Sequence, residues 1–350
     1  MAFDATTLDD IYSHDFDTLI DVRTPAEYAE DHLPGAINLP VLSDEERAHV
    51  GTIYTQENPF LARKIGAALV ARNAAAHIEG PLAYKDGGWR PLIYCWRGGQ
   101  RSGSFASILN QIGWRAETLN GGYQSYRRLI VAALYKSAFP APVILLDGNT
   151  GTGKTEIIHR LQSLGVQSID LEDLASHRGS ALGEAGPQPS QKAFESSLAR
   201  ISSGLDPARP VVVEAESSRI GQLYLPPQIF AAMKSAPRIE ITASQASRAE
   251  FLVRAYAEDI ADYKDFAARL DGLVRLQGRE RVEAWQEALR AGSFDQVAAE
   301  MIELHYDPSY AKSRERRGGN VLATCFASGL DDSGLDLLAI EVAAVVRAQQ

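Results

Sequence analysis

The amino-acid sequence predicts an α/β protein with two parallel-sheet domains and a mostly helical C-terminal region. Short β-branched runs alternate with helical patterns through much of the 350 residues, and this alternation is typical of parallel sheets covered by helices. The segment FPAP at 139–142 interrupts it, because its prolines disfavour continuation of a helix. Beyond residue 245 the apolar positions recur at helical spacing over long stretches.

The first domain is predicted to span 1–138. TLIDV at 18–22 and PLIYC at 91–95 are expected as strands, each followed by a helix, in PAEYAEDHL and RSGSFASILNQI. The second domain is predicted at 142–245, with strands in PVILLD, VQSID and PVVVE and a helix in GKTEIIHRLQSL. Residues 246–350 are predicted to form a helical region that packs on the second domain.

Composition limits the class of protein. The chain is 45% hydrophobic and 23% charged, which is typical of a globular protein. It has two cysteines, an acidic polar N-terminus, and no apolar run of the roughly 18 residues that a membrane span needs. We therefore expect a cytoplasmic protein in a reducing compartment, not inserted in a membrane. The net charge of −10 argues against a nucleic-acid partner unless positive charge is concentrated locally.

An anion-binding loop is predicted after the strand at 91–95. Cys95 ends that strand, two glycines permit tight turns, and a helix is expected to begin near Ser102. Backbone amides, the N-terminal end of that helix and two arginines would lower the pKa of Cys95 and make it a nucleophile. The predicted loop is Trp96, Arg97, Gly98, Gly99, Gln100 and Arg101. The alternative is a buried structural cysteine, which is the interpretation we prefer for Cys325 in the apolar segment VLATCFA.

A Cys followed by Arg six positions later serves both protein phosphatases and sulfur carriers, so the spacing alone does not decide. The segment IDVRTPAEYAEDHLPGAINLP at 20–40 and GGYQSYR at 121–127 resemble the rhodanese family. That resemblance implies sulfurtransferase-type chemistry at Cys95, with a persulfide or its selenium analogue. His32, in the turn HLPGA, is expected to orient that turn instead of acting as a base. The segment around 41–90 is long for this family and predicts additional helices, for substrate access or for packing.

A phosphate-binding loop follows the strand PVILLD. Its residues match G-x-x-x-x-G-K-[ST] between a strand and a helix: Gly148, Asn149, Thr150, Gly151, Thr152, Gly153, Lys154 and Thr155. The lysine would neutralise a terminal phosphate, and Thr155 could bind Mg²⁺ if a metal is used. Asp170, Glu214 and Glu216 are expected to organise a metal or water, although the two glutamates could instead pair with arginines such as Arg219. The motif predicts a phosphate ligand and does not specify ATP.

The segments CWRGGQRS, DGNTGTGKTEII, DLEDLASHRGSALG, VVVEAESSRIG and HYDPSY together resemble the tRNA 2-selenouridine synthase family over nearly the whole chain. That resemblance implies conversion of wobble 2-thiouridine to 2-selenouridine with selenophosphate, and S-geranylation from geranyl diphosphate. It implies no tightly bound cofactor, and a selenophosphate supplier as a possible partner. Our hypothesis is that the phosphate loop holds the diphosphate while Cys95 takes part in the selenium step, as a selenylated carrier or as a nucleophile toward the base.

An acidic protein that binds tRNA needs local basic clusters. The candidates are Arg127, Arg128, Arg275, Arg279, Arg281, Arg314, Arg316 and Arg317. Any one of these clusters could equally be a solvated helix face. Trp96, Tyr306 and Tyr310 could stack on an extruded base, although aromatic residues more often lie in a core.

Two other functions fit parts of the sequence. One is a sulfurtransferase fused to an ATP-dependent kinase-like module that acts on a small molecule. The other is a nucleotide-regulated binding module whose first domain only senses anions, and the presence of Cys95, Arg97 and Arg101 argues against it.

Overall fold

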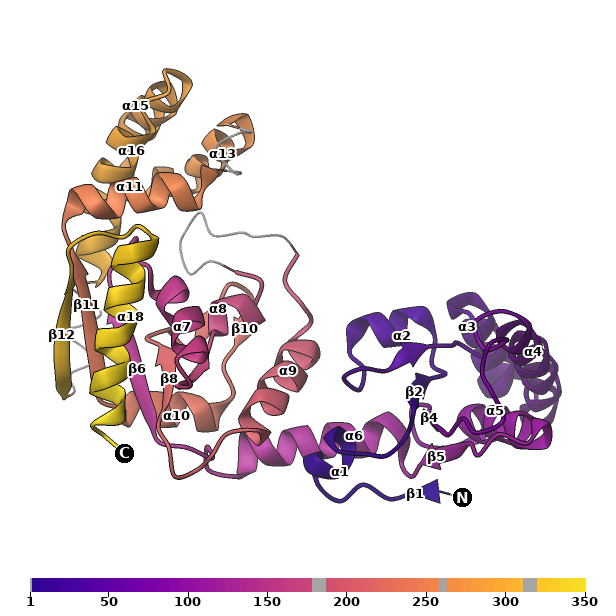
Figure 1. The fold of residues 1–350 in the computed structure, drawn as a ribbon. Helices are drawn as coiled ribbons and strands as arrows, with labels where there is room; N and C mark the ends of the chain where they lie inside the picture. The colour runs from indigo at the N-terminus through magenta and orange to yellow at the C-terminus, as the bar shows by residue number, and fades with distance from the viewer. Residues whose placement is uncertain (1, 178–186, 258–262, 311–319) are drawn as a thin grey trace. The chain divides into compact units, whose positions relative to one another are not determined.

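The computed structural model describes residues 2–177, 187–257, 263–310 and 320–350 (Figure 1). The chain divides into two compact units. The first comprises Met1–Ser137 and Pro189–Ser203, and the second comprises Ala138–Gln188 and Gly204–Gln350. The division after residue 137 lies next to the FPAP segment, where the sequence places the domain boundary.

The first unit is built on a parallel sheet of order β1-β5-β4-β2-β3. Its strands are β1 (Ala2–Phe3), β2 (Thr18–Asp21), β3 (Ile37–Asn38), β4 (Pro91–Tyr94) and β5 (Glu117–Leu119). Its helices are α1 (Leu8–Tyr12), α2 (Pro25–Glu30), α3 (Asp44–Thr52), η1 (Ile53–Glu57), α4 (Pro59–Glu79), α5 (Gln100–Ile112), α6 (Gly122–Val131), η2 (Ala132–Lys136) and α9 (Gln191–Ser203). All four residues of β4 are buried, so the strand that leads to Cys95 is a central one.

Helix α9 differs from the sequence-based division, which assigns all of 142–245 to the second domain. It packs against α1, α6 and η2 of the first unit. Phe194 and Leu198 are fully buried there, and Ser196 donates a 2.9 Å hydrogen bond to Asp31. These partners are distant in sequence from α9, which is why local patterns do not reveal the assignment.

The second unit contains another parallel sheet, of order β12-β11-β6-β8-β7. Its strands are β6 (Val143–Gly148), β7 (Gln167–Ile169), β8 (Val211–Glu214), β11 (Arg238–Ala243) and β12 (Val321–Ala327), and β9 (Arg219–Ile220) pairs with β10 (Leu223–Tyr224). Helices α7 (Lys154–Ser163) and α18 (Asp332–Arg347) bury their apolar faces on this sheet. The remaining short helices near it are α8 (Leu171–Leu174) and α10 (Pro227–Ser235).

A helical subregion follows β11, as the sequence predicts. It comprises α11 (Gln245–Ala255), α13 (Tyr263–Arg269), η3 (Leu270–Leu273), α14 (Val274–Gln277), α15 (Arg279–Arg290), α16 (Phe294–Met301) and η4 (Ile302–Tyr306). A separate apolar core centred on the fully buried Trp285 holds these helices together.

The C-terminal region 246–350 is not helical throughout. Residues Val321–Ala327 form β12, which extends the sheet beside β11 and carries the fully buried Cys325. Burial raises the pKa of Cys325 to about 12, in agreement with its expected place in the core. Within the part of the chain that the structure describes, no helix has the length and apolarity to cross a membrane.

Candidate functional site

The first candidate site is the loop between β4 and α5. Cys95 directly follows the buried strand and is itself 4% exposed. Gly99 precedes α5 without a side-chain cap, so the first amides of that helix are available to the loop. This arrangement places the sulfur at the N-terminal end of α5.

Hydroxyl and backbone amide groups donate hydrogen bonds to the sulfur of Cys95. The Ser102 hydroxyl lies 3.2 Å from Sγ, and the Gly99 amide nitrogen lies 3.3 Å from it. Burial opposes ionisation, but the hydrogen bonds from Ser102, Gly99 and the Arg97 amide outweigh it and lower the pKa of Cys95. The thiolate fraction at neutral pH is therefore higher than that of an ordinary cysteine, which suits a nucleophile.

Backbone hydrogen bonds from the start of α6 hold the Cys95 loop in place. The amide of Tyr123 donates to the Cys95 carbonyl at 2.8 Å, and the amide of Gln124 donates to the Trp96 carbonyl at 3.0 Å. Gly122 has φ +56°, and a Cβ there would lie 2.2 Å from the Cys95 carbonyl oxygen. Only glycine allows this approach, so the GGYQSYR segment shapes the Cys95 loop.

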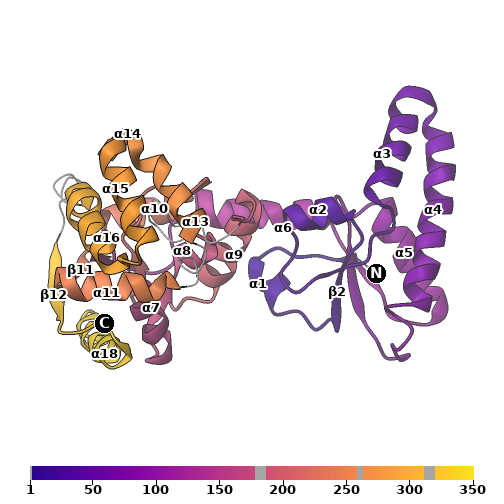
Figure 2. The same ribbon diagram turned by 90° about the horizontal axis from the view of Figure 1, so that it is seen from above.

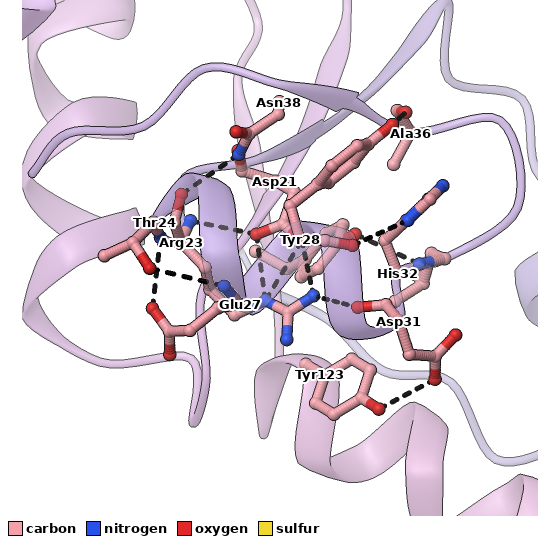
Figure 3. A network of polar contacts seen from close by, with 12 residues as sticks. Asp21, Arg23, Thr24, Glu27, Tyr28, Asp31, His32, Ala36, Asn38 and Tyr123 are labelled. Carbon is pink, nitrogen blue, oxygen red and sulfur yellow. Dashed lines mark hydrogen bonds and ion pairs between the residues drawn. The ribbon is translucent and has the colours of Figure 1, made fainter. Parts of the chain in front are cut away.

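A buried ionic network fixes the neighbouring chain segments (Figure 3). Arg23 pairs with Asp21 at 2.6 Å, and both side chains are fully buried. The same guanidinium donates to the Asp31 carbonyl at 2.6 Å and lies 4.1 Å from the centre of the Tyr123 ring. Tyr123 in turn donates to the Asp31 carboxylate at 2.7 Å. Asp21 and Arg23, in the segment that resembles rhodaneses, thus help to fix Tyr123, and the Tyr123 amide positions the Cys95 loop.

The loop arginines do not act on the thiolate in the way the sequence suggests. Arg101 forms a 2.6 Å ion pair with Glu27, 74 residues away, and the Arg97 side chain is exposed. Hydrogen bonds from Ser102 and from backbone amides, instead of the arginine charges, lower the pKa of Cys95. His32 contacts the Tyr28 carbonyl at 3.0 Å and stacks on the Tyr28 ring, in agreement with a turn-orienting role.

The second candidate site is the loop between β6 and α7. Gly151 and Gly153 have φ of +84° and +73°, which a phosphate-binding loop requires of its glycines. The Lys154 ammonium donates to the Gly148 carbonyl at 2.9 Å. Burial disfavours its charge, but Tyr310 and the carboxylates of Glu172, Glu216 and Glu214 outweigh this effect and raise the pKa of Lys154.

The loop borders a cavity of about 450 Å³. Its polar lining includes the loop itself together with Glu172 and His159. Its apolar lining, called here the apolar wall, comes from α11, from Tyr256 directly after it and from Tyr310; its members are Phe251, Leu252, Ala255, Tyr256 and Tyr310. The cavity therefore suits an anion that carries an apolar group.

The back of the phosphate loop is clamped by residues that the sequence does not single out. Arg248 is 5% exposed, pairs with Asp307 at 2.7 Å and donates to the Thr150 carbonyl at 2.9 Å. Asp307 also accepts a 2.8 Å hydrogen bond from Asn149. These bonds join the loop to α11 and to the end of η4, and they hold the apolar wall against the phosphate cradle.

The carboxylates are arranged differently from the prediction. Asp170 caps α8 through the Asp173 amide and pairs with His159 at 2.8 Å. Glu172, which the sequence does not single out, lines the cavity with its carboxylate 3.5 Å from the Thr155 hydroxyl. It lies only two positions beyond Asp170, but local sequence does not reveal which of several carboxylates faces the loop.

Glu214 is the last residue of β8, and Glu216 lies beyond the strand. Glu214 is fully buried and accepts a 2.8 Å hydrogen bond from the Leu171 amide. Burial, together with the neighbouring Asp170 and Glu172, raises the pKa of Glu214 well above its ordinary value and favours its protonated form. Within the described ranges, no group of three or more histidine, cysteine or acidic residues forms a ready metal site. A divalent cation that arrived with a phosphate ligand would find oxygen ligands in Thr155 and Glu172.

The predicted tRNA-binding residues are scattered. Arg127 forms an ion pair with Glu195, so its charge is neutralised within the first unit. Arg128, Arg275, Arg279 and Arg281 are exposed. Arg314, Arg316 and Arg317 lie outside the described residues.

The three aromatic candidates also differ from one another. Tyr306 is buried in the helical core, which removes it as a stacking platform. Tyr310 lines the phosphate cavity, and its ring centre lies 5.7 Å from the Lys154 ammonium. Trp96 lies beside Tyr123 with ring centres 5.3 Å apart.

Comparison with known families agrees with this geometry. Residues 4–129 match the family described as "Rhodanese-like domain", and residues 141–292 match "tRNA 2-selenouridine synthase AAA domain". The Cys95 loop falls in the first match and the phosphate loop falls in the second.

Whole proteins give the same result. The tRNA 2-selenouridine synthase of Nitrosomonas europaea is 36% identical over 243 residues, which cover 68% of this chain and 63% of that protein. Those of Cupriavidus pinatubonensis and Alcanivorax borkumensis are each 33% identical, cover 87% of this chain, and are matched over 90% and 91% of their own lengths.

Proposed function

The chain belongs to the tRNA 2-selenouridine synthase family, a family of tRNA-modifying transferases, and on that premise we propose that it converts wobble 2-thiouridine to 2-selenouridine through an S-geranylated intermediate. The donors would be geranyl diphosphate and selenophosphate, the latter received from the enzyme that makes it. No tightly bound cofactor is required, and a cytoplasmic location is expected because tRNA is the substrate.

The phosphate-loop cavity is proposed as the geranylation site. Lys154 and the loop amides bind the diphosphate, while the apolar wall formed by α11 and Tyr310 accommodates the hydrocarbon. The thiocarbonyl sulfur of the tRNA attacks the allylic carbon, the C–O bond breaks, and the diphosphate leaves with the electron pair. The positive charge of Lys154 stabilises the departing oxygen. A Mg²⁺ ion bound by Thr155 and Glu172 would add to that stabilisation.

The Cys95 loop is proposed as the selenation site. S-alkylation turns a poor leaving group into a thiol, so carbon 2 of the base becomes open to attack. Electron balance distinguishes two roles for Cys95. The selenium of selenophosphate and the Cys95 thiol are both fully reduced, so an S–Se bond between them would require an oxidant.

A nucleophilic role for Cys95 needs no oxidant. The thiolate attacks carbon 2 and geranylthiol leaves, after which selenium from selenophosphate displaces Cys95. Water then cleaves the P–Se bond and releases phosphate, so no net oxidation or reduction takes place. The lowered pKa of Cys95 supplies the thiolate that this sequence requires.

One observation carries the proposal: the same chain has both sites. In the first, a loop donates hydrogen bonds to the Cys95 sulfur, and in the second, a phosphate loop borders a cavity with an apolar wall. The test is mass spectrometry of a tRNA that contains 2-thiouridine after incubation with protein and both donors. Cys95→Ala should accumulate S-geranyl-2-thiouridine, and Lys154→Ala should leave 2-thiouridine unchanged.

Each variant controls for the other, because each should keep the half-reaction that the other loses. Loss of both half-reactions in folded Cys95→Ala would contradict the division of labour. Normal geranylation by Lys154→Ala would remove the diphosphate from the phosphate loop. A requirement for ATP in place of geranyl diphosphate would favour the kinase-like alternative.

A further inference from the structure

The helical insertion of the first unit forms a second cavity next to the Cys95 loop. Helices α3 and α4 lie side by side, joined by η1 (Figure 2). Between them and the first turns of α5 is a cavity of about 380 Å³. Gln100, Arg101 and Ser104 form its α5 side, and Ser102, on the same two turns, contacts the Cys95 sulfur.

The lining of this cavity combines apolar surface with positive charge. Its apolar members include Leu42, Val50, Tyr54, Ala67 and Val70. Arg47 and Arg63 stand at it with exposed side chains, and neither forms an ion pair with a carboxylate among the described residues. No aspartate or glutamate lines the cavity. A volume of this size lies within the range of about 300–1,000 Å³ that small-molecule sites occupy.

The proposed function creates a need for such a cavity. In the selenation step the base carries a ten-carbon hydrocarbon on the sulfur that must leave, and phosphates flank that nucleoside on both sides. The apolar lining complements the hydrocarbon, and the two arginines complement the phosphates. The cavity lies beside the loop where carbon 2 is attacked, so the same nucleotide can reach both.

We propose that the cavity between α3, α4 and α5 binds the geranyl group of the S-geranylated wobble nucleoside during selenation, with Arg47 and Arg63 on the adjoining phosphates. This inference rests on the proposed function. It assigns the insertion around 41–90 to substrate binding. It also makes Ala67 a specificity-determining position, because a larger side chain there would fill the space meant for the hydrocarbon.

The test uses the full-length protein, selenophosphate and two short RNA stem-loops, one with S-geranyl-2-thiouridine and one with S-methyl-2-thiouridine. Both substrates lose a thiol of similar leaving ability, and only one has a long hydrocarbon. Ala67→Trp should lower kcat/KM for the S-geranyl RNA by about tenfold or more and leave the S-methyl RNA unchanged, since misfit in an apolar pocket costs factors of about this size. The matched control is Ala68→Trp, an exposed neighbour on α4 that does not line the cavity and should affect neither substrate.

The arginines provide a second readout. Arg47→Ala together with Arg63→Ala should raise KM for both RNAs, leave kcat unchanged and flatten the salt dependence of KM. Arg72→Ala is the control, because Arg72 lies on α4 like Arg63 but does not line the cavity, and it should not change KM. Equal activity of Ala67→Trp and Ala68→Trp on the S-geranyl RNA would overturn the inference and leave the proposed function intact. Failure of the unsubstituted protein to use the S-geranyl RNA at all would instead overturn the proposed function.

Discussion

The two candidate sites use the same local architecture for opposite electrostatic purposes. Each is a loop between a buried parallel strand and the N-terminus of a helix. At the first loop a potential anion, the Cys95 thiolate, belongs to the protein and is stabilised by neutral donors. At the second loop the charge that the protein supplies is the Lys154 cation, which lines the cavity, so the loop is suited to an anion that arrives from outside. The difference shows that a strand–loop–helix anion cradle can serve a nucleophile or a ligand, depending on which charge the protein provides.

Gly122→Ala should have the largest effect on stability and selenation, because it disrupts the contact between the start of α6 and the Cys95 loop. The new Cβ would lie 2.2 Å from the Cys95 carbonyl oxygen at a residue with φ +56°. We expect the free energy of unfolding of the first unit to fall by about 2–4 kcal/mol and selenation to be lost.

Denaturant unfolding and selenation of S-geranyl RNA measure these two effects. Gly103→Ala is the matched control, because Gly103 lies within α5 and a Cβ there meets nothing within 4 Å. Retention of both stability and selenation in Gly122→Ala would show that the α6 segment does not shape the loop.

Ser102→Ala should have an intermediate effect by removing a donor to the Cys95 thiolate. The pKa of Cys95 should rise, so the thiolate should appear at higher pH and the acid limb of the selenation profile should move upward in pH. The rate of alkylation by iodoacetamide as a function of pH measures the change directly. Cys325 should not interfere, because it is fully buried and burial raises its pKa.

Ser104→Ala, in the next turn of the same helix, is the control for alkylation. An unchanged alkylation profile in Ser102→Ala would mean that the backbone amides alone lower the pKa of Cys95.

Glu214→Gln should have the smallest effect on activity, and it should change how the free energy of unfolding depends on pH. Because the pKa of Glu214 is raised in the folded state, its contribution to stability is fully present below the unfolded pKa of about 4.3 and is lost as pH rises toward the folded value. Glutamine does not ionise, so this loss should disappear in the variant.

Unfolding free energies from pH 4 to 8 should therefore fall less steeply for Glu214→Gln than for the unsubstituted protein. Glu216→Gln serves as the control. Identical slopes for Glu214→Gln and the unsubstituted protein would mean that folding does not raise the pKa of Glu214.

The local motifs of both sites could be predicted because they are contiguous in sequence. Cys95 and the residues from Gly148 to Thr155 each lie between a strand and a helix with clear periodicity. The partners that tune them are not contiguous: Arg101 pairs with Glu27 across 74 residues, and Arg248 reaches Asp307 across 59. A charged residue in a motif therefore predicts that a charge lies close to the site. It does not predict whether that charge already forms an ion pair with a distant residue.

Two features of the fold were unpredictable for a related reason. The β12 segment VLATCFA lies in a region of helical periodicity, and its role as a strand depends on pairing with β11 some 80 residues earlier. Helix α9 lies between elements of the second unit in sequence, but its buried Ser196 and Glu195 find their partners in the first unit. In both cases a long-range partner overrides the local pattern.

The central claim is that geranylation and selenation take place at separate loops. It is tested most directly by supplying Lys154→Ala with RNA that already contains S-geranyl-2-thiouridine, so that the phosphate loop is bypassed. We predict that the variant forms 2-selenouridine from this RNA and selenophosphate at the rate of the unsubstituted protein. Loss of selenation by the folded variant would contradict the claim, because it would place Lys154 in both steps.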